Sequence, residues 1–297
     1  MTGREDTAPP IPWTVGDILN VTAEFLGKKN IPTPRLDAEL LLGRVLGLQR
    51  VQLYVNFERL LEPHEVDDYR ELVRRRSKRE PAAYILGERE FYAIPFIVTG
   101  DVLIPRPETE ILVDEALSTA KRNPTPAELR VCDVGTGCGC IAAALARNLP
   151  GTRVEASDME QAALDVARRN LEALDLAGRV TLVRGDLMDA PFASSSFDIV
   201  CANLPYVPSA AIPELEPDVR DYEPHSALDG GPDGLDPYRR FLPQAAARLA
   251  PGGTIVLECQ PDQFAALIEL ALSLNLAPRP PVQDLSGRDR IFSASRP

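Results

Sequence analysis

The chain of 297 residues carries a formal net charge of −12 at neutral pH, with 44% hydrophobic and 26% charged residues. This length and composition are typical of a globular protein with one large and one small domain, and no apolar run is long enough for a membrane span. Residues 1–83 carry 13 basic and 13 acidic side chains, so the negative charge falls on the remainder. A net negative charge on this part of the chain argues against a domain that binds the phosphate backbone of a nucleic acid.

The amino terminus and the cysteines indicate a cellular location. Residues 1–12 are polar and rich in proline, without the apolar core of a secretory signal, so we expect a cytoplasmic protein. Cys138 and Cys140 are too close together for the usual CxxC pairs of zinc sites. We therefore expect five free thiols that fill small apolar positions, and no metal.

Residues 1–83 are predicted to form a small helical domain. Apolar residues at helical spacing predict helices from about Thr14, from Arg35, around Leu53 and from Pro63 to about Lys78. The basic run at residues 74–79 closes the last of these helices, whose first turn is acidic, as a helix dipole favours. A solvated helix end is the preferred interpretation, with a partner-docking surface as the alternative.

Residues 84–105 are predicted to form a β-hairpin that links two domains. Their apolar residues are β-branched or aromatic and occur in short runs, which Gly87 and Gly100 separate. A helix is then expected after Pro107, because proline favours the first helical turn.

Strands and helices alternate through the rest of the predicted third segment, residues 106–297. Strands are expected at 129–134, 152–157, 180–183, 197–202, 254–259 and near 289–293, with helices between most of them. This alternation predicts an α/β fold with a mainly parallel sheet and helices on both faces. Ligands of such sheets bind beyond the carboxyl ends of the strands.

A glycine loop follows the first of these strands, in the order Gly135-Thr136-Gly137-Cys138-Gly139. Glycines let a backbone turn sharply and approach a ligand closely. The GxGxG spacing differs from the GxGxxG of dinucleotide-binding proteins, and no GK[ST] of a phosphate loop is present. Asp133, at the end of the strand, suits the cationic S-adenosylmethionine and would repel a pyrophosphate.

Two more acids follow the next two strands. Asp158 is placed to accept the ribose hydroxyls, and Asp186, followed by Leu187, is placed near the adenine edge. A single such Asp is more often a turn or helix cap. Three acids at successive strand ends beside a glycine loop favour a cofactor site.

The fourth strand runs into Asn203-Leu204-Pro205-Tyr206. A planar NH₂ group is a poor nucleophile and must be held in line with the methyl–sulfur bond. The Asn203 side-chain carbonyl and the Leu204 backbone carbonyl can each accept one N–H, Pro205 stiffens the turn, and Tyr206 can pack on the planar group. In isolation the tetrapeptide would be an ordinary β-turn, but its position after strand four favours methyl transfer.

The chain resembles the release-factor glutamine methyltransferases, also called the PrmC/HemK family, over nearly its full length. The motifs that carry the resemblance are Pro81–Gly87, Val102–Glu110, Asp133–Gly139, Asn203–Tyr206, Glu223–Leu228, Gly230–Arg239, Gly252–Glu258 and Asp284–Arg290. The family usually has Asn-Pro-Pro-Tyr where position 204 is Leu here, and Asn-Leu-Pro-Tyr is similar to the motif of ribosomal-RNA adenine dimethyltransferases.

The resemblance implies a seven-stranded, Rossmann-like class I methyltransferase fold behind a helical domain that recognises release factors. It implies methylation of the glutamine side-chain amide in the Gly-Gly-Gln motif of class 1 release factors, with S-adenosylhomocysteine as the second product. Carried over by position, the cofactor contacts are Asp133, Gly135, Thr136, Gly137, Cys138, Gly139, Asp158, Asp186, Leu187 and Asn203. Asn203, Leu204, Pro205 and Tyr206 would receive the glutamine, in a monomer that contacts no membrane and no nucleic acid.

Two other functions remain open from the sequence. A nucleic-acid adenine or cytosine amino-methyltransferase would use the same tetrapeptide on a planar base, although the acidic charge and the Ile104–Glu110 segment favour glutamine. A catalytically silent binding module would be expected to have a damaged glycine loop or to lack Asn203, and both are intact.

Overall fold

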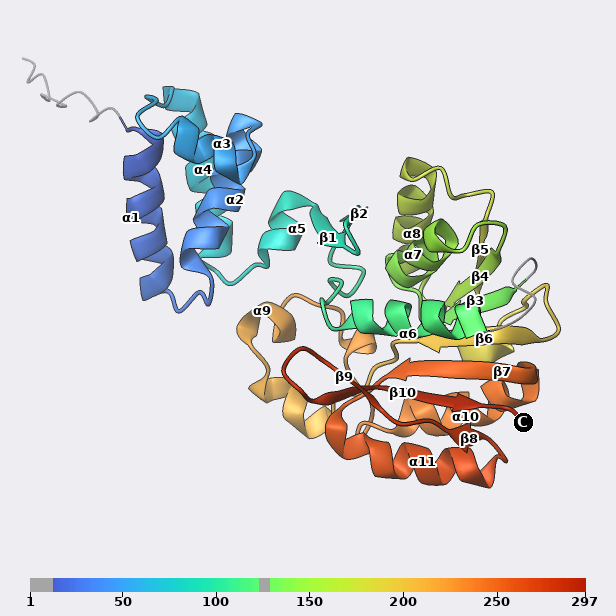
Figure 1. Ribbon diagram of the computed structural model, residues 1–297. Helices are drawn as coiled ribbons and strands as arrows, with labels where there is room; N and C mark the ends of the chain where they lie inside the picture. Colours follow the sequence, from blue (N-terminus) through green and yellow to red (C-terminus); the bar gives the residue numbers. More distant parts are fainter. Residues whose placement is uncertain (1–12, 123–128) are drawn as a thin grey trace, which may run out of the picture. The chain divides into compact units, whose positions relative to one another are not determined.

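The computed structural model describes residues 13–122 and 129–297, and the chain divides between Leu86 and Gly87 into two compact units. Residues 1–12, whose composition led us to expect no secretory signal, lie outside the described part. The N-terminal unit contains the helices α1 (Val15–Lys28), α2 (Pro34–Leu46), α3 (Arg50–Val55), α4 (Pro63–Arg76) and α5 (Ala82–Leu86) (Figure 1). The predicted helical character of this region is confirmed.

The start of α1 shows why these residues become helical. The backbone N–H of Asp17 donates to Thr14 Oγ1 at 3.0 Å, and the Asp17 carboxylate accepts from the Thr14 backbone N–H in return. This reciprocal cap satisfies N–H groups that have no partner within the helix. The apolar stripe that follows, including Leu19 and Leu26, is fully buried.

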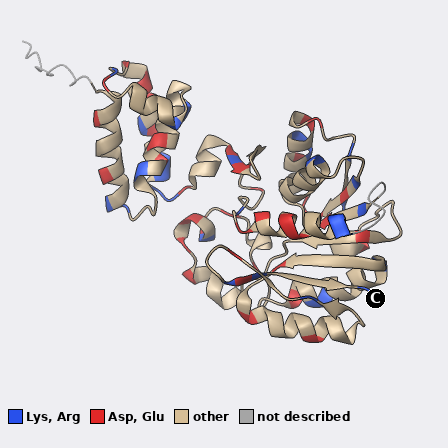
Figure 2. Cartoon of the chain, in the orientation of Figure 1, with Lys and Arg blue, Asp and Glu red and all other residues tan. Residues whose placement is uncertain are grey.

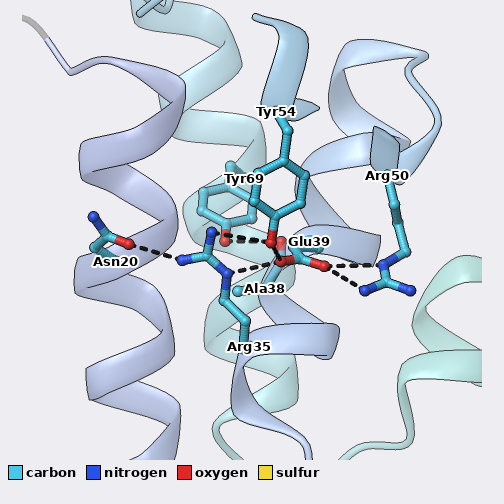
Figure 3. Close-up of polar contacts among 7 residues, drawn as sticks. All are labelled: Asn20, Arg35, Ala38, Glu39, Arg50, Tyr54 and Tyr69. Atoms are coloured by element: carbon cyan, nitrogen blue, oxygen red, sulfur yellow. Dashed lines mark hydrogen bonds and ion pairs between the residues drawn. The ribbon is translucent and has the colours of Figure 1, made fainter. Parts of the chain in front are cut away.

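A buried carboxylate joins the helices of the N-terminal unit (Figure 3). Glu39, on α2, is 1% exposed and accepts hydrogen bonds from Arg35 Nε at 2.7 Å, from Arg50 Nη2 at 2.7 Å and from the Tyr54 hydroxyl. Arg35 also donates to Asn20 Oδ1 on α1 at 2.8 Å. Burial opposes ionisation of Glu39, but the bonds from Tyr54, Arg35 and Arg50 outweigh it and lower its pKa. The charge is therefore paired, and α3 is held against α2.

The basic run at residues 74–79 is only partly a solvated helix end. Arg74 is exposed and pairs with Glu71 at 2.6 Å, as expected for a helix surface. Arg76, in contrast, is 3% exposed and forms an ion pair with the buried Asp37 of α2 at 2.6 Å. The interpretation as a solvated end is therefore wrong for Arg76, whose charge ties α4 to α2.

The hairpin begins the C-terminal unit and consists of β1 (Glu88–Phe91) and β2 (Ile94–Ile97). Its two turn residues, Tyr92 and Ala93, both have positive φ, 54° and 55°, as a tight two-residue hairpin turn requires. The Tyr92 N–H donates to Glu110 Oε1 at 2.7 Å, which fixes the turn to the helix α6 (Thr109–Arg122). Asn170 fixes β2 from the other side, through bonds to the backbone N–H and C=O of Ile97 at 2.7 and 3.0 Å.

The hairpin is shorter than the predicted 84–105 segment. Residues 84 and 85 belong to α5, because the backbone N–H groups of Tyr84 and Ile85 bond to the Pro81 carbonyl in a helical turn. Residues 102–104 form no strand, since the prolines at 105 and 107 lack the N–H groups that would continue a ladder. The predicted strands at both ends of the segment are therefore wrong.

The central sheet contains β3 (Arg130–Val134), β4 (Arg153–Asp158), β5 (Val180–Arg184), β6 (Phe197–Ala202), β7 (Leu249–Glu258), β8 (Ala277–Pro278), β9 (Val282–Gln283) and β10 (Asp289–Ser295). Its order is β5-β4-β3-β6-β7-β10-β8, with β9 also paired to β10. The strands from β5 to β7 are parallel and β10 is antiparallel to its neighbours. The predicted mainly parallel α/β fold is confirmed.

Eight strands occur where seven were expected, because one strand position is interrupted. The two short strands β8 and β9 both pair with β10 along one edge. Between them lies Arg279-Pro280-Pro281, and proline cannot donate to a ladder, so the edge strand breaks into two pieces. The two pieces occupy the place of one continuous strand.

Helices cover both faces of the sheet (Figure 1). The long helices are α6 (Thr109–Arg122), α7 (Cys140–Asn148) and α8 (Gln161–Ala173) on one face and α10 (Asp236–Arg248) and α11 (Phe264–Ser273) on the other. Short elements are η2 (Leu187–Asp189), η3 (Ser209–Glu214), α9 (Pro217–Arg220), η4 (His225–Ala227) and η5 (Pro261–Gln263). All five cysteines are buried free thiols, as predicted. Within residues 13–122 and 129–297, no helix is both long and apolar enough to cross a membrane.

Candidate active site

A cavity lies at the carboxyl ends of β3, β4, β5 and β6, where a parallel sheet is expected to bind its ligand. The residues from the strand ends that line it are Gly135, Thr136, Gly137, Cys138, Asp158, Asp186, Leu187, Asn203, Leu204 and Pro205. Residues from two other segments complete the wall: Asp101, Val102, Leu103, Pro105, Arg106, Thr109, Pro224, Ser226 and Ala227. Most of the residues predicted from the sequence thus share one cavity, while Asp133, Gly139 and Tyr206 lie outside its lining.

The glycine loop takes a conformation that requires its glycines. Gly135, Gly137 and Gly139 have φ values of 72°, 54° and 83°, in the left-handed region that residues with a Cβ rarely adopt. A Cβ at Gly139 would approach the Cβ of Ala167 to 3.2 Å, so the loop packs closely on α8. A Cβ at Gly137 would meet no protein atom within 4 Å, which leaves this part of the backbone open to a ligand.

Asp133 supports the loop from below. Its Oδ2 accepts from the Thr136 hydroxyl at 2.6 Å and from the Ala142 N–H, at the start of α7, at 3.1 Å, while its Oδ1 is buried without a hydrogen-bond partner among the described residues. Burial raises the pKa of Asp133 to about 7, and the nearby Asp158 adds to the shift. The side chain therefore shapes the loop and places a titratable group beneath it.

Asp158 stands at the end of β4 and faces the cavity. Its Oδ2 accepts from the Gly137 N–H at 2.9 Å and its Oδ1 from the Glu160 N–H at 3.0 Å. Burial raises its pKa, against the effect of these bonds. Each carboxylate oxygen has a further lone pair, so the acid can hold the loop and still accept from ligand hydroxyls.

Asp186 and Leu187 follow β5, and their environments differ. Asp186 forms an ion pair with Arg240 of α10, and both side chains are about half exposed. Leu187 lines the cavity with a φ of 51°, which is unusual for a residue with a branched side chain. Such strain persists where the surroundings enforce it, often at ligand sites. Contact of either residue with adenine stays a prediction.

The Asn203 side chain belongs to a chain of hydrogen bonds. Its Nδ2 donates to Thr109 Oγ1 at 3.1 Å, and the Thr109 hydroxyl donates to Glu258 Oε2 at 2.6 Å. Glu258 is 1% exposed, and its other oxygen accepts from the Tyr206 hydroxyl at 3.0 Å. Asn203 and Tyr206 are the first and last residues of the tetrapeptide. They are thus connected through the Thr109 hydroxyl on α6 and the buried Glu258 on β7.

A glycine-rich segment packs against the far end of the tetrapeptide. A Cβ at Gly234 would lie 2.3 Å from the Tyr206 carbonyl oxygen, and one at Gly230 would lie 2.8 Å from the Tyr206 Cα. Gln263 Nε2 donates to the carbonyls of Tyr206 and Gly234, both at 3.0 Å. Only residues without a side chain fit at 230 and 234, so this segment fixes the backbone at Tyr206.

Arg106 and Glu223 join two of the segments that surround the cavity. Arg106 Nη2 donates to Glu223 Oε1 at 2.6 Å, and the Ile104 N–H donates to Glu223 Oε2 at 3.3 Å. Burial raises the pKa of Glu223, whereas the charge of Arg106 works in the opposite direction. The ion pair closes the wall of the cavity between residues 104–106 and the loop before η4.

These features fit a cofactor that is cationic and carries hydroxyl groups. The open backbone at Gly137 leaves room for it, and the acid Asp158 faces the cavity beside that backbone. In the C-terminal unit, basic positions are spread over many elements and interspersed with acidic ones (Figure 2). Such a distribution does not resemble a groove built for a phosphate backbone.

Comparisons with known proteins agree with this geometry. The PrmC N-terminal domain family matches residues 17–87, and a methyltransferase domain family matches residues 131–220. A release factor glutamine methyltransferase of Geobacter sulfurreducens is 42% identical over 96% of this chain and 98% of its own length. One of Rhodopirellula baltica is 41% identical over 98% of this chain and 99% of its own length.

The chain belongs to the release factor glutamine methyltransferase family. It is an S-adenosylmethionine-dependent methyltransferase, as the sequence predicted. A methyltransferase from Pyrococcus furiosus, 16% identical, has the same fold with a TM-score of 0.50 over 69% of this chain and 90% of its own. The class I methyltransferase fold is thereby confirmed.

In this member of the release factor glutamine methyltransferase family, sequence reasoning missed several site residues. Thr109, Arg106, Glu223 and Glu258 were noticed only as parts of family motifs and were given no role. Their roles depend on contacts between segments more than 100 residues apart in the chain, such as the one between Thr109 and Glu258. The one available signal was that a charged residue, Glu258, ends an otherwise apolar strand.

Proposed function

We propose that the enzyme transfers a methyl group from S-adenosylmethionine to the side-chain amide nitrogen of the glutamine in the Gly-Gly-Gln motif of class 1 release factors. The observation that carries this proposal is the position of Asn203, which lines the same cavity as the glycine loop and Asp158. An acceptor held by Asn203 would therefore lie beside the cofactor. In support, relatives named release factor glutamine methyltransferase are about 40% identical over nearly their full length.

The chemistry requires positioning rather than a strong base. When bound, S-adenosylmethionine supplies a methyl group on a good leaving group. Asn203 Oδ1 and the Leu204 carbonyl would each accept one N–H of the acceptor amide, which holds its nitrogen in line with the methyl group. As the new N–C bond forms, the C–S bond electrons remain on sulfur, and the amide nitrogen loses one proton to water.

Tyr206 and Pro205 would shape the acceptor side of this site. The Tyr206 hydroxyl donates a hydrogen bond to Glu258, and the backbone carbonyl of Tyr206 accepts one from Gln263. Burial and the adjacent Glu258 raise the pKa of Tyr206, so the ring stays neutral and offers a flat surface to a planar amide. The glycine segment at 230–234 would prevent this surface from moving away.

We also propose that the N-terminal unit, residues 1–86, engages the release factor. In support, exposed apolar side chains gather on α3: Val51 is 74% exposed, Val55 is 81% exposed and Tyr54 is 52% exposed. These three residues share one face of a short helix. The buried Glu39 cluster holds this helix in place through Arg50 and Tyr54 (Figure 3), while Val51 and Val55 stay exposed.

A methyl-transfer assay with a labelled donor tests the function directly. The acceptors are purified class 1 release factor, the same factor with its Gly-Gly-Gln glutamine changed to alanine, and ribosomal RNA. We expect label only in the unchanged release factor. Label in RNA and none in the release factor would refute the proposal and favour the nucleic-acid alternative. Equal labelling of both release factors would place the acceptor at another residue.

A further inference from the structure

Glu258 is a buried acid for which the methyl-transfer scheme has no direct use. Glu258 is the last residue of β7, beside the end of β6, which Asn203 follows directly in the chain. It is 1% exposed. Among the described residues, both hydrogen bonds to its carboxylate come from hydroxyl groups, those of Thr109 at 2.6 Å and Tyr206 at 3.0 Å. A buried carboxylate is costly to keep, so its retention beside the acceptor tetrapeptide calls for a reason.

The Thr109 hydroxyl connects this acid to Asn203 and has only one proton to donate. Because an ionised carboxylate can only accept, the proton of Thr109 is directed at Glu258 Oε2. The Thr109 oxygen must then accept its second hydrogen bond, and the group that faces it at 3.1 Å is the Asn203 Nδ2. The carbonyl Oδ1 of Asn203 is thereby turned away from Thr109, on a residue that lines the cavity.

The orientation matters because an amide side chain has two ends with opposite hydrogen-bonding properties. With Oδ1 available, Asn203 accepts from an NH₂ group. With the amide reversed, it would present its own NH₂ to the acceptor, and two donors would face each other. The direction of one hydroxyl proton at Thr109 thus decides whether the site accepts or repels an amide nitrogen.

We propose that Glu258 and Thr109 are positioning residues that fix the Asn203 side chain as an acceptor toward the substrate. Glu258 acts through Thr109 on one side and holds the Tyr206 hydroxyl on the other. This inference rests on the proposed function, because it assumes a planar NH₂ acceptor at Asn203. It assigns the orientation of the Asn203 amide to two residues outside the tetrapeptide and the glycine loop.

The orientation of the Asn203 amide also depends on the charge state of Glu258. Burial raises its pKa, while the bonds from Thr109 and Tyr206 and the charge of Arg290 favour the ionised form. A proton on Glu258 Oε2 would be donated to Thr109, which would then donate to Asn203 and reverse the amide, whereas a proton on Oε1 would be donated to the Tyr206 hydroxyl and leave the bond from Thr109 unchanged. The negative charge of Glu108 also raises the pKa of Glu258.

Thr109→Val removes the hydroxyl at nearly constant volume, and Thr109→Ser restores it. We expect Thr109→Val to lower kcat about 10–100-fold, the scale of a misplaced catalytic group, with KM for the release factor and Kd for S-adenosylmethionine changed less than about threefold. Thr109→Ser should recover most of kcat. Thr119→Val is the control, because Thr119 is also buried and hydrogen-bonded on α6 but does not line the cavity.

Three results with the threonine variants would each overturn the proposal. One is a Thr109→Val kcat within twofold of the unchanged enzyme. The second is a loss that Thr109→Ser fails to restore, and the third is a loss that Thr119→Val reproduces. Thermal unfolding of each variant shows whether it folds, and Glu258→Gln provides a second perturbation of the same chain of bonds.

A double variant decides whether both residues act on the same group. If Glu258 acts through Thr109, the loss in Thr109→Val/Glu258→Gln should be well below the product of the two single losses. A loss equal to the product would show independent roles and contradict the proposal. The unchanged enzyme is assayed in parallel on release factor, which separates the proposed function from the positioning role. If the unchanged enzyme is inactive, the proposed function is refuted. If it is active and Thr109→Val is equally active, only the positioning role is refuted.

Discussion

Asp133 offers a test of how burial of one acid is linked to the stability of the catalytic unit. Its carboxylate is fully buried, and burial raises its pKa from 3.8 to about 7. In the unfolded chain the same acid ionises near its ordinary pKa. Between these two values the folded protein holds a proton that the unfolded chain has lost. Stability is therefore highest at low pH for this group and falls as the pH rises toward 7.

The magnitude follows from the shift. Each pKa unit corresponds to about 1.4 kcal/mol, so a shift from 3.8 to about 7 removes at most about 4 kcal/mol of stability above pH 7. Roughly half of this loss falls between about pH 5.5 and 8. Asp133→Asn abolishes the titration and keeps an acceptor for Thr136 and Ala142. It places an NH₂ where Oδ1 has no partner, at a cost of about 1–3 kcal/mol.

Urea or thermal unfolding from about pH 5.5 to 8 measures the effect. The unchanged protein should lose about 2 kcal/mol more than Asp133→Asn over this interval, and the variant should be at least as stable at pH 8. Equal pH dependence of the two proteins would refute the reasoning. Because Asp158 is also shifted upward, the informative quantity is the difference between the proteins and not either slope alone.

Three further predictions concern the acceptor site and the N-terminal unit. Asn203→Ala should lower kcat by about 100-fold or more while S-adenosylmethionine binds within about threefold of normal, measured by single-turnover transfer and calorimetry. Gly234→Ala should destabilise the protein by about 2–4 kcal/mol and lower activity, measured by urea unfolding and methyl transfer, because its Cβ would meet the Tyr206 carbonyl oxygen at 2.3 Å. Val51→Asp/Val55→Asp should raise KM for the release factor at least about tenfold without changing cofactor affinity.

The glycine variant and the valine variant each have a matched control. Gly287 has the same φ of 75° as Gly234 but open space around its missing Cβ, so Gly287→Ala reports strain without the clash. Leu272, on α11, is 58% exposed, so Leu272→Asp reports the effect of an added surface charge. Normal transfer by Asn203→Ala, equal stability of the two alanine variants, or an unchanged KM in the valine variant would contradict the respective prediction.

Features that depend on neighbouring residues could be predicted from the sequence. The start of α1 follows from Thr14 and Asp17, which cap each other over three positions. The glycine loop and the acid after β4 were found because parallel strands bring their carboxyl ends to one edge. In each case the signal and the structure it specifies lie within one strand–loop–helix unit.

Features that depend on distant pairing could not be predicted. The hairpin turn at Tyr92-Ala93 lacks the Asn-Gly pair usual for positive φ, and its anchor Glu110 lies on another element. The contact between Thr109 and Glu258 joins α6 to β7, and a single sequence contains no signal for that approach. The helical turn at Tyr84 and Ile85 was missed because their aromatic and β-branched character favours strands, while Pro81 starts a turn that overrides it.

Leu204 shows how a departure from a motif can be understood from packing. The side chain is 3% exposed and belongs to the core of the C-terminal unit, and its Cδ2 would lie 3.3 Å from a Cβ at Gly135. Leucine therefore fills the space between the tetrapeptide and the glycine loop. The carbonyl that would hold the acceptor amide belongs to the backbone and is kept by any residue at this position. The substitution thus changes how the loop is supported, and the groups available to an acceptor NH₂ remain those of Asn203 and the backbone beside it.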